Sequence, residues 1–85
     1  MINLLAVDDE MINLMIIDES LSDKGFTVVK ARDGEEAFQI LSSDSILFHA
    51  IILDRLMPKM DGIELLKKSN VPKSIKTFLL SFKQL

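Results

Sequence analysis

Short apolar runs alternate along this chain with longer segments of helical spacing, and this alternation constrains the fold more than any other feature. The runs Ile2–Val7 and Ala50–Leu53 are almost wholly apolar, and Phe26–Lys30 is rich in β-branched residues. Runs of this kind are typical of a parallel sheet, whose strands are buried on both faces. We therefore predict strands at these three positions and a fourth at Ile75–Phe82.

The segments between these runs predict helices, which supply the crossovers that parallel strands need. Glu10–Lys24 carries apolar residues at positions 11, 14, 15, 17 and 21, which is a helical spacing. Gly25 follows it, and glycine is a usual residue just beyond a helix end. The first crossover is therefore predicted to be a helix that ends before Gly25.

Two later helices are predicted from the spacing of a capping box. Asp33 precedes Glu36 by three residues, and Asp61 precedes Glu64 by three residues, so we expect helices to begin at both aspartates. The resulting order, β-α-β-α-β-α-β with right-handed crossovers, predicts an α/β fold with a doubly wound parallel sheet. We expect residues 1–85 to form a single domain.

Composition excludes several kinds of site. The chain has no cysteine, which excludes disulfides, and its only histidine is His49, which excludes a His-rich zinc site. His49 precedes a predicted strand and lacks a partner histidine, so we expect a surface or packing role for it. The 10 basic and 13 acidic residues give a net charge of −3, too balanced for an electrostatic grip on nucleic acid.

The N-terminal run has none of the marks of a signal peptide, and no segment approaches the ~18 apolar residues of a membrane span. We therefore expect a soluble cytoplasmic protein with no nucleic-acid or membrane partner.

Carboxylates follow two of the predicted strands. Asp8 and Asp9 come directly after the first strand, and Asp54 ends the third. Ligands of doubly wound sheets bind beyond the carboxyl ends of the strands, so neighbouring strands would bring these three acids into one crevice. A hard cation such as Mg²⁺ relieves their repulsion, takes oxygen ligands and keeps waters for a phosphoryl group. Asp54 would then lie where a cation can hold a phosphoryl donor against it.

Helix capping is the main alternative for these acids. Asp8 or Asp9 alone is more often a helix N-cap than a ligand, by roughly two to one, and we assign Asp61 to capping. Asp54 has no such alternative, because no helix is predicted to begin between it and Asp61. The spacing of the whole set favours a functional site.

At this point the sequence resembles a response-regulator receiver domain of two-component signalling. The matching residues, which span positions 2 to about 66, are Asp8-Asp9-Glu10, the stretch KARDGEEAF at Lys30–Phe38, and Asp54 followed by Met57-Pro58 and Met60-Asp61-Gly62. The resemblance implies a flavodoxin-like fold. It also implies that Asp54 is the nucleophile that accepts a phosphoryl group from a sensor histidine kinase or a phosphotransfer protein.

The resemblance assigns further roles around Asp54. Asp9 would bind Mg²⁺ directly, and Asp8 would assist it through water. Asp54 and the backbone carbonyl of Leu56 would complete the protein ligands. Ser81, which closes the stretch TFLLS, would contact the phosphoryl group and signal its presence.

The chain departs from the family toward its C-terminal end. Family members have five strand–helix units, whereas this chain ends after its predicted fourth strand and looks like a truncated receiver. No lysine closes a fifth strand, and Phe82 stands where the family has a small residue. An exposed edge strand and an uncovered apolar side of the first helix, with Met11, Met15 and Ile16, would then invite self-association through the C-terminal strand.

Three functions remain open from the sequence. The first is a Mg²⁺-dependent phosphoacceptor that is not an enzyme in the ordinary sense and signals by protein contact. The second is a degenerate receiver that binds proteins without phosphorylation. The third is a phosphatase-like hydrolase with an aspartate nucleophile, which is weakest because Leu56 stands where a second acid is expected.

Overall fold

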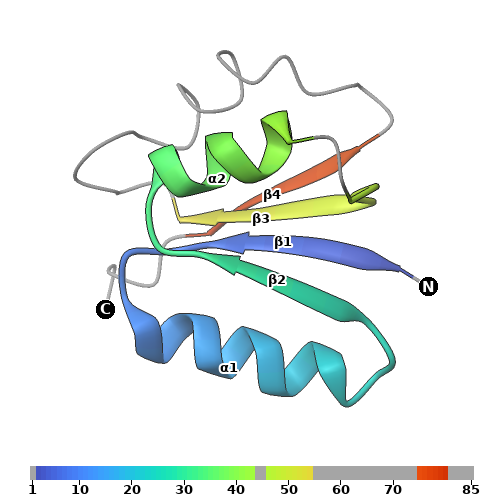
Figure 1. The fold of residues 1–85 in the computed structure, drawn as a ribbon. Helices are drawn as coiled ribbons and strands as arrows, with labels where there is room; N and C mark the ends of the chain where they lie inside the picture. The colour runs from blue at the N-terminus through green and yellow to red at the C-terminus, as the bar shows by residue number, and fades with distance from the viewer. Residues whose placement is uncertain (1, 44–45, 55–74, 81–85) are drawn as a thin grey trace.

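The computed structural model describes residues 2–43, 46–54 and 75–80, without the side chains of residues 54 and 76–80. The described residues form a parallel sheet of four strands in the spatial order β2-β1-β3-β4. The strands are β1 (Asn3–Val7), β2 (Thr27–Ala31), β3 (Ala50–Asp54) and β4 (Lys76–Leu80), and the helices are α1 (Met11–Ser22) and α2 (Gly34–Ser42). The predicted parallel α/β sheet is confirmed (Figure 1), and the ends of each strand lie within two residues of their predicted positions.

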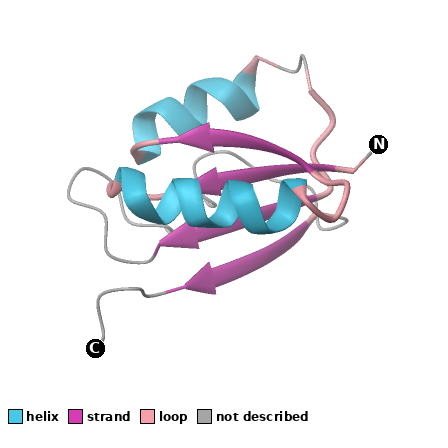
Figure 2. Ribbon diagram, turned by 90° about the horizontal axis from the view of Figure 1, so that it is seen from below, coloured by secondary structure: helices cyan, strands magenta, loops and turns pink. Residues whose placement is uncertain are grey.

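The two helices cover opposite faces of the sheet because alternate strand residues point to opposite sides. The core on the α2 face consists of Leu5, Val7, Ala31, Ala37, Phe48, Ile51 and Leu53. The core on the α1 face consists of Ala6, Leu14 and Ile17. Figure 1 shows the sheet between α1 and α2, and Figure 2 shows the four strands pointing the same way behind α1. The sheet is therefore doubly wound, as predicted.

The apolar residues of α1 divide between a buried side and an exposed side. Leu14 and Ile17 are buried, whereas Met11 and Met15 are 61% and 51% exposed, as expected for the uncovered side of this helix. Asn13 is buried instead, with 8% exposure. Apolar spacing of three and four residues allows two neighbouring stripes on one helix, and the sheet packs against the stripe that includes position 13.

The ends of the helices follow local side-chain chemistry. The Asp33 carboxylate accepts a hydrogen bond from the backbone N–H of Glu36 at 2.8 Å, which confirms the predicted start of α2. The Glu36 carboxylate accepts from the N–H of Arg32 at 2.8 Å, one residue earlier than a capping box requires. Beyond α1, Gly25 has a φ of 92°, a left-handed conformation that glycine adopts without strain.

Some expectations fall outside the described residues. The helix predicted to begin at Asp61 is one of them, and the single truncated domain over residues 1–85 stays a prediction. Within the segments that the structure describes, no helix has the length and apolar character to cross a bilayer.

Candidate functional site

The strands that carry the predicted acids are neighbours. β1 and β3 pair in parallel from Leu4↔Ala50 to Val7↔Leu53, so Asp8 and Asp54 occupy the next position on adjacent strands. Adjacent strands lie ~4.8 Å apart, which brings the two backbones together at the carboxyl edge of the sheet. β2 lies on the other side of β1 (Figure 1), so the strand order reverses at this point. The predicted crevice therefore has the backbone arrangement that it requires.

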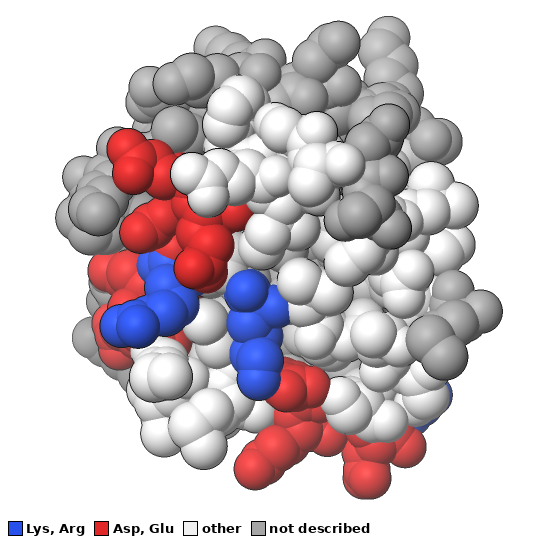
Figure 3. Space-filling model, in the orientation of Figure 1, with Lys and Arg blue, Asp and Glu red and all other residues white. Residues whose placement is uncertain are grey.

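The edge of the sheet toward which the strands point is acidic. The loops after β1 and β2 and the first turn of α2 contribute Asp8, Asp9, Glu10, Asp33, Glu35 and Glu36. Figure 3 shows acidic side chains gathered on the side to which the strands point in Figure 1, next to basic groups. The acids outnumber the basic Arg32 of the loop after β2, and such an excess of negative charge favours cations at this edge.

Asp8 is a buried and hydrogen-bonded acid of this edge. Its side chain is 1% exposed. One carboxylate oxygen, Oδ1, accepts from the N–H of Glu10 at 2.9 Å, and Oδ2 accepts from Nδ2 of Asn13 at 3.1 Å. The Asp8 N–H donates to the carbonyl of Ala31 at 3.1 Å, which extends the pairing of β1 with β2. The fold itself thus fixes the orientation of this carboxylate.

The capping alternative for Asp8 and Asp9 is wrong. The N-cap residue of α1 is Glu10, and it makes no side-chain capping bond. The Asp8 carboxylate accepts a hydrogen bond from the N–H of Glu10, the N-cap residue itself.

The residues after β1 fit magnesium. Carboxylate oxygens are the ligands that this hard cation prefers, and Asp8 and Asp9 supply them on consecutive positions. Asp8 is buried, which suits an indirect contact through water, whereas Asp9 is partly exposed and suits a direct contact. Residues with described side chains contain no group of three acids or histidines arranged to hold a metal, and the predicted trio depends on Asp54.

The remaining predicted site residues are only partly described. The backbone of Asp54 ends β3, but its side chain lies outside the described residues. Leu56, with its predicted carbonyl ligand, and Ser81 and Phe82 also lie outside them. Their roles stay predictions.

Sequence reasoning missed Asn13. Helical spacing was read from apolar positions only. The amide of Asn13 next to Leu14, within the apolar stretch MINLMII, was the signal for a buried polar side chain. A buried amide needs a hydrogen-bond partner. For an amide in the first turn of a helix that packs on a sheet, that partner is expected in the preceding loop or in the sheet. The partner is the Asp8 carboxylate.

Lys30, which begins the matching stretch KARDGEEAF, pairs with Asp18 on α1. Its Nζ lies 2.9 Å from Oδ2 of Asp18, and the Ser22 hydroxyl donates to Oδ1 of Asp18 at 2.6 Å. These two bonds, first from Ser22 and then from Lys30, hold the pKa of Asp18 below its usual 3.8. Lys30 therefore ties β2 to α1 beside the acidic edge.

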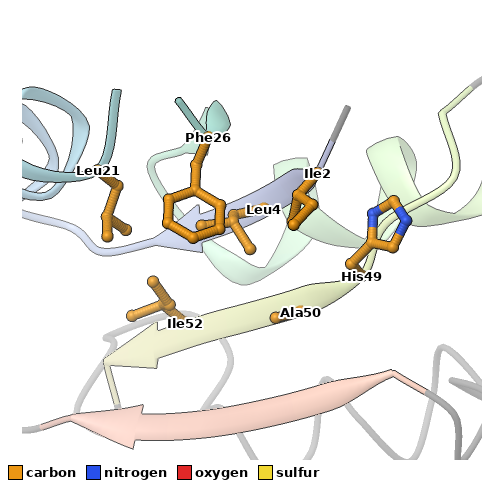
Figure 4. A pocket seen from close by; sticks show the side chains of 7 residues that line it. All are labelled: Ile2, Leu4, Leu21, Phe26, His49, Ala50 and Ile52. Atoms are coloured by element: carbon orange, nitrogen blue, oxygen red, sulfur yellow. The ribbon is translucent and has the colours of Figure 1, made fainter. Parts of the chain in front are cut away.

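An apolar cavity of about 370 Å³ lies elsewhere, on the α1 face toward the amino ends of the strands. It is lined by Ile2, Leu4, Leu21, Phe26, His49, Ala50 and Ile52 (Figure 4). Nδ1 of His49 accepts from the N–H of Asn3 at 3.1 Å, and the His49 N–H donates to the Asn3 carbonyl at 2.9 Å. His49 thus joins β1 to the start of β3, which agrees with the packing role expected for it.

The family "Response regulator receiver domain" matches residues 4–84. Among curated relatives, "Probable transcriptional regulator ycf27" of Porphyridium aerugineum is 40% identical over 73 residues, covering 81% of this chain and 30% of the relative. "Response regulator MprA" of Mycobacterium ulcerans is 37% identical over 67 residues, covering 79% of this chain and 28% of the relative. The chain therefore spans about three tenths of the length of these curated relatives.

A solved structure agrees with these sequence matches. The response regulator TrrA of Thermotoga maritima, solved in complex with Mg²⁺-BeF, superposes with a TM-score of 0.86 at 30% identity. The superposition covers 99% of this chain and 72% of TrrA. Together with the strand order β2-β1-β3-β4 and the acids at its reversal point, these matches show that the chain belongs to the response regulator receiver domain family.

Proposed function

We propose that this chain is a phosphoacceptor. In this proposal Asp54 takes a phosphoryl group from the phosphohistidine of a sensor histidine kinase or a phosphotransfer protein. The phosphorylated chain then signals by protein contact. The observation that carries the proposal is the β1–β3 register, which makes Asp8 and Asp54 neighbours at the acidic edge. A phosphohistidine made from ATP implies a cytoplasmic setting.

The proposed reaction is a direct phosphoryl transfer. A carboxylate oxygen of Asp54 attacks the phosphorus, the new P–O bond forms, and the P–N bond to the donor imidazole breaks. The imidazole leaves with the electron pair of that bond and is neutralised by a proton from solvent. Such a transfer needs little covalent chemistry from the protein, so alignment of the donor accounts for most of the catalysis.

Four groups would hold a magnesium ion in this proposal: the side chains of Asp8, Asp9 and Asp54 and the carbonyl of Leu56. When bound, the ion supplies positive charge that offsets the negative charge on the phosphoryl oxygens. Ser81 would contact the same oxygens. The Asp8 carboxylate is buried and accepts two hydrogen bonds, which hold it in one orientation. A ligand fixed in this way would help to align the phosphoryl donor.

The test is phosphorylation by a small donor. The whole chain is incubated with Mg²⁺ and acetyl phosphate, and intact mass spectrometry follows the gain of one phosphoryl group. We expect uptake in the wild-type chain and none in Asp54→Asn or after chelation of Mg²⁺. Glu35→Gln, which removes an exposed acid of the same edge, is the matched control and should retain full uptake. Equal uptake in Asp54→Asn, or none in a folded wild-type chain, would contradict the proposal.

A phosphorylation-independent binding module is the second candidate. The exposed apolar residues of α1, among them Met11, Met15 and Ile16, favour it because such side chains commonly mark protein interfaces. A folded wild-type chain that neither gains a phosphoryl group nor binds Mg²⁺ would support this function over the first.

A further inference from the structure

We propose that Asn13 is a positioning residue of the magnesium site. Through its hydrogen bond, Asn13 holds the Asp8 carboxylate in the orientation that supports the cation. This inference rests on the proposed function and adds a residue from α1 to it.

The hydrogen bond between Asn13 and Asp8 joins two buried side chains. Nδ2 of Asn13 lies 3.1 Å from Oδ2 of Asp8, and the two side chains are 8% and 1% exposed. The other carboxylate oxygen is held by the N–H of Glu10 at 2.9 Å. Hydrogen bonds to an ionised acceptor are about twice as strong as neutral ones, and here they come from the N-cap residue and the first turn of α1. Loss of the Asn13 donor would remove the hydrogen bond to Oδ2 of Asp8.

The backbone of Asn13 is itself fixed. Its N–H donates to the carbonyl of Glu10 at 3.1 Å in the first turn of α1. The side-chain amide of Asn13 therefore projects from a helix and not from a loop. Helices hold supporting side chains more precisely than loops do.

Packing alone does not account for an amide at this position. Asn13 lies on the buried side of α1 with Leu14 and Ile17, where an apolar residue would pack against the sheet without a desolvated polar group. Burying an amide destabilises a fold unless the amide is hydrogen-bonded. The partner that satisfies this amide is an acid of the proposed cation site, so the polar residue serves Asp8 rather than the core.

The expected effect is a loss of magnesium affinity. Residues that orient a metal ligand without touching the metal typically contribute 10- to 100-fold to affinity. We therefore expect Asn13→Leu to weaken Mg²⁺ binding by about 10-fold or more. Asn13→Ala, which favours the helix, should give a similar loss and carries the test if the leucine variant does not fold.

The experiment is a double-mutant cycle read by calorimetric titration of the whole chain with Mg²⁺. The variants are Asn13→Leu, Asp8→Asn and the combination, with Ile17→Val as a control on the same buried side of α1. The Asn13 change should have no further effect once Asp8 has been replaced, because its action passes through Asp8. Ile17→Val should bind Mg²⁺ within about twofold of wild type despite its loss of packing.

The outcomes separate this inference from the proposed function. Wild-type affinity in both Asn13 variants would overturn the positioning role while leaving the phosphoacceptor proposal intact. An equal loss from Asn13→Leu with and without Asp8 would also overturn it, since the effect would then not pass through Asp8. A wild-type chain that binds no Mg²⁺ would overturn the cation site itself and this inference with it. Thermal unfolding without Mg²⁺ reports the structural cost of each change separately.

Discussion

Asp18 on α1 accepts hydrogen bonds from Ser22, one turn later on the same helix, and from Lys30 on β2. The bond from Ser22 is the larger cause of its lowered pKa, and the bond from Lys30 is the second. A carboxyl whose pKa is lower in the folded state stabilises the fold at pH above its unfolded pKa. That contribution is lost as the pH falls from the unfolded pKa through the folded value.

This linkage predicts a pH-dependent effect of Asp18→Asn. At neutral pH the variant should have a lower free energy of unfolding than wild type, and the difference should shrink as the pH falls below 3.8. Urea unfolding at several pH values measures this difference in the free energy of unfolding. In a separate NMR titration, Ser22→Ala should raise the pKa of Asp18 because it removes the hydrogen bond from Ser22. A difference between wild type and Asp18→Asn that stays constant with pH would refute the linkage.

The cap of α2 gives a second prediction at this scale. Asp33→Ala removes the acceptor for the N–H of Glu36 and should lower the free energy of unfolding by about 1 kcal/mol. Gln39→Ala, at an exposed position of the same helix, should change it by less than about 0.5 kcal/mol. Urea unfolding of both variants measures the contrast, and equal effects would show that the cap contributes nothing.

At the scale of elements, α1 combines a buried side with an exposed apolar side. Leu14 is 2% exposed and packs with Ala6 and Ile17, whereas Met15, its neighbour, is 51% exposed. Met11 and Ile16 are also more than half exposed, so the uncovered apolar side of α1 that the sequence predicted is confirmed. The helix is therefore stabilised mainly through one side, and the other is available to a partner.

Truncating each side should give different results. Leu14→Ala should lower the free energy of unfolding by roughly 2–5 kcal/mol, because it removes buried contacts and leaves a cavity. Met15→Ala should change it by less than about 0.5 kcal/mol. Chemical denaturation at low protein concentration measures both, and a comparable loss for Met15→Ala would show that its side of α1 is covered.

The elements could be predicted from sequence more fully than the site. Strands β1 and β3 are short apolar runs that end on acids, so the pattern predicted parallel strands with Asp8 and Asp54 at their carboxyl ends. That the two strands are adjacent is shown by the structure and was only a condition in the sequence argument. The hydrogen bond between Asn13 and Asp8 could not be predicted in the same way. Periodicity shows which side of a helix is apolar, but it does not show which polar groups form hydrogen bonds with one another. Met11 and Met15 share the helical spacing of the buried residues, so spacing alone could not show which apolar side of α1 packs against the sheet.

At the scale of the whole molecule, two surfaces favour association with a second copy. β4 lies at an edge of the described sheet, and an edge strand presents backbone groups that can pair with another chain. The exposed apolar residues of α1 and the cavity of about 370 Å³ lie on one face of the same sheet. We propose that the chain self-associates through these surfaces.

Sedimentation velocity at micromolar concentrations tests this proposal. We expect species larger than a monomer in the wild-type chain and a shift toward monomer in Ile16→Glu, which places a charge on the exposed apolar side of α1. Leu47→Glu, at a position 75% exposed outside the helix, is the control and should leave the distribution unchanged. A compact wild-type monomer throughout would exclude self-association at these concentrations.

The pairing of β1 with β3 has a consequence for when the chain can be modified. Asp8 and Asp54 are separated in sequence by α1, β2, α2 and most of β3, and their backbone positions become neighbours only when β3 pairs with β1 in the correct register. A one-residue slip in that pairing would point every side chain of β3 to the opposite face. Under the proposed function, phosphorylation of Asp54 would therefore require the native β1–β3 register, and a chain with a shifted register would not be phosphorylated.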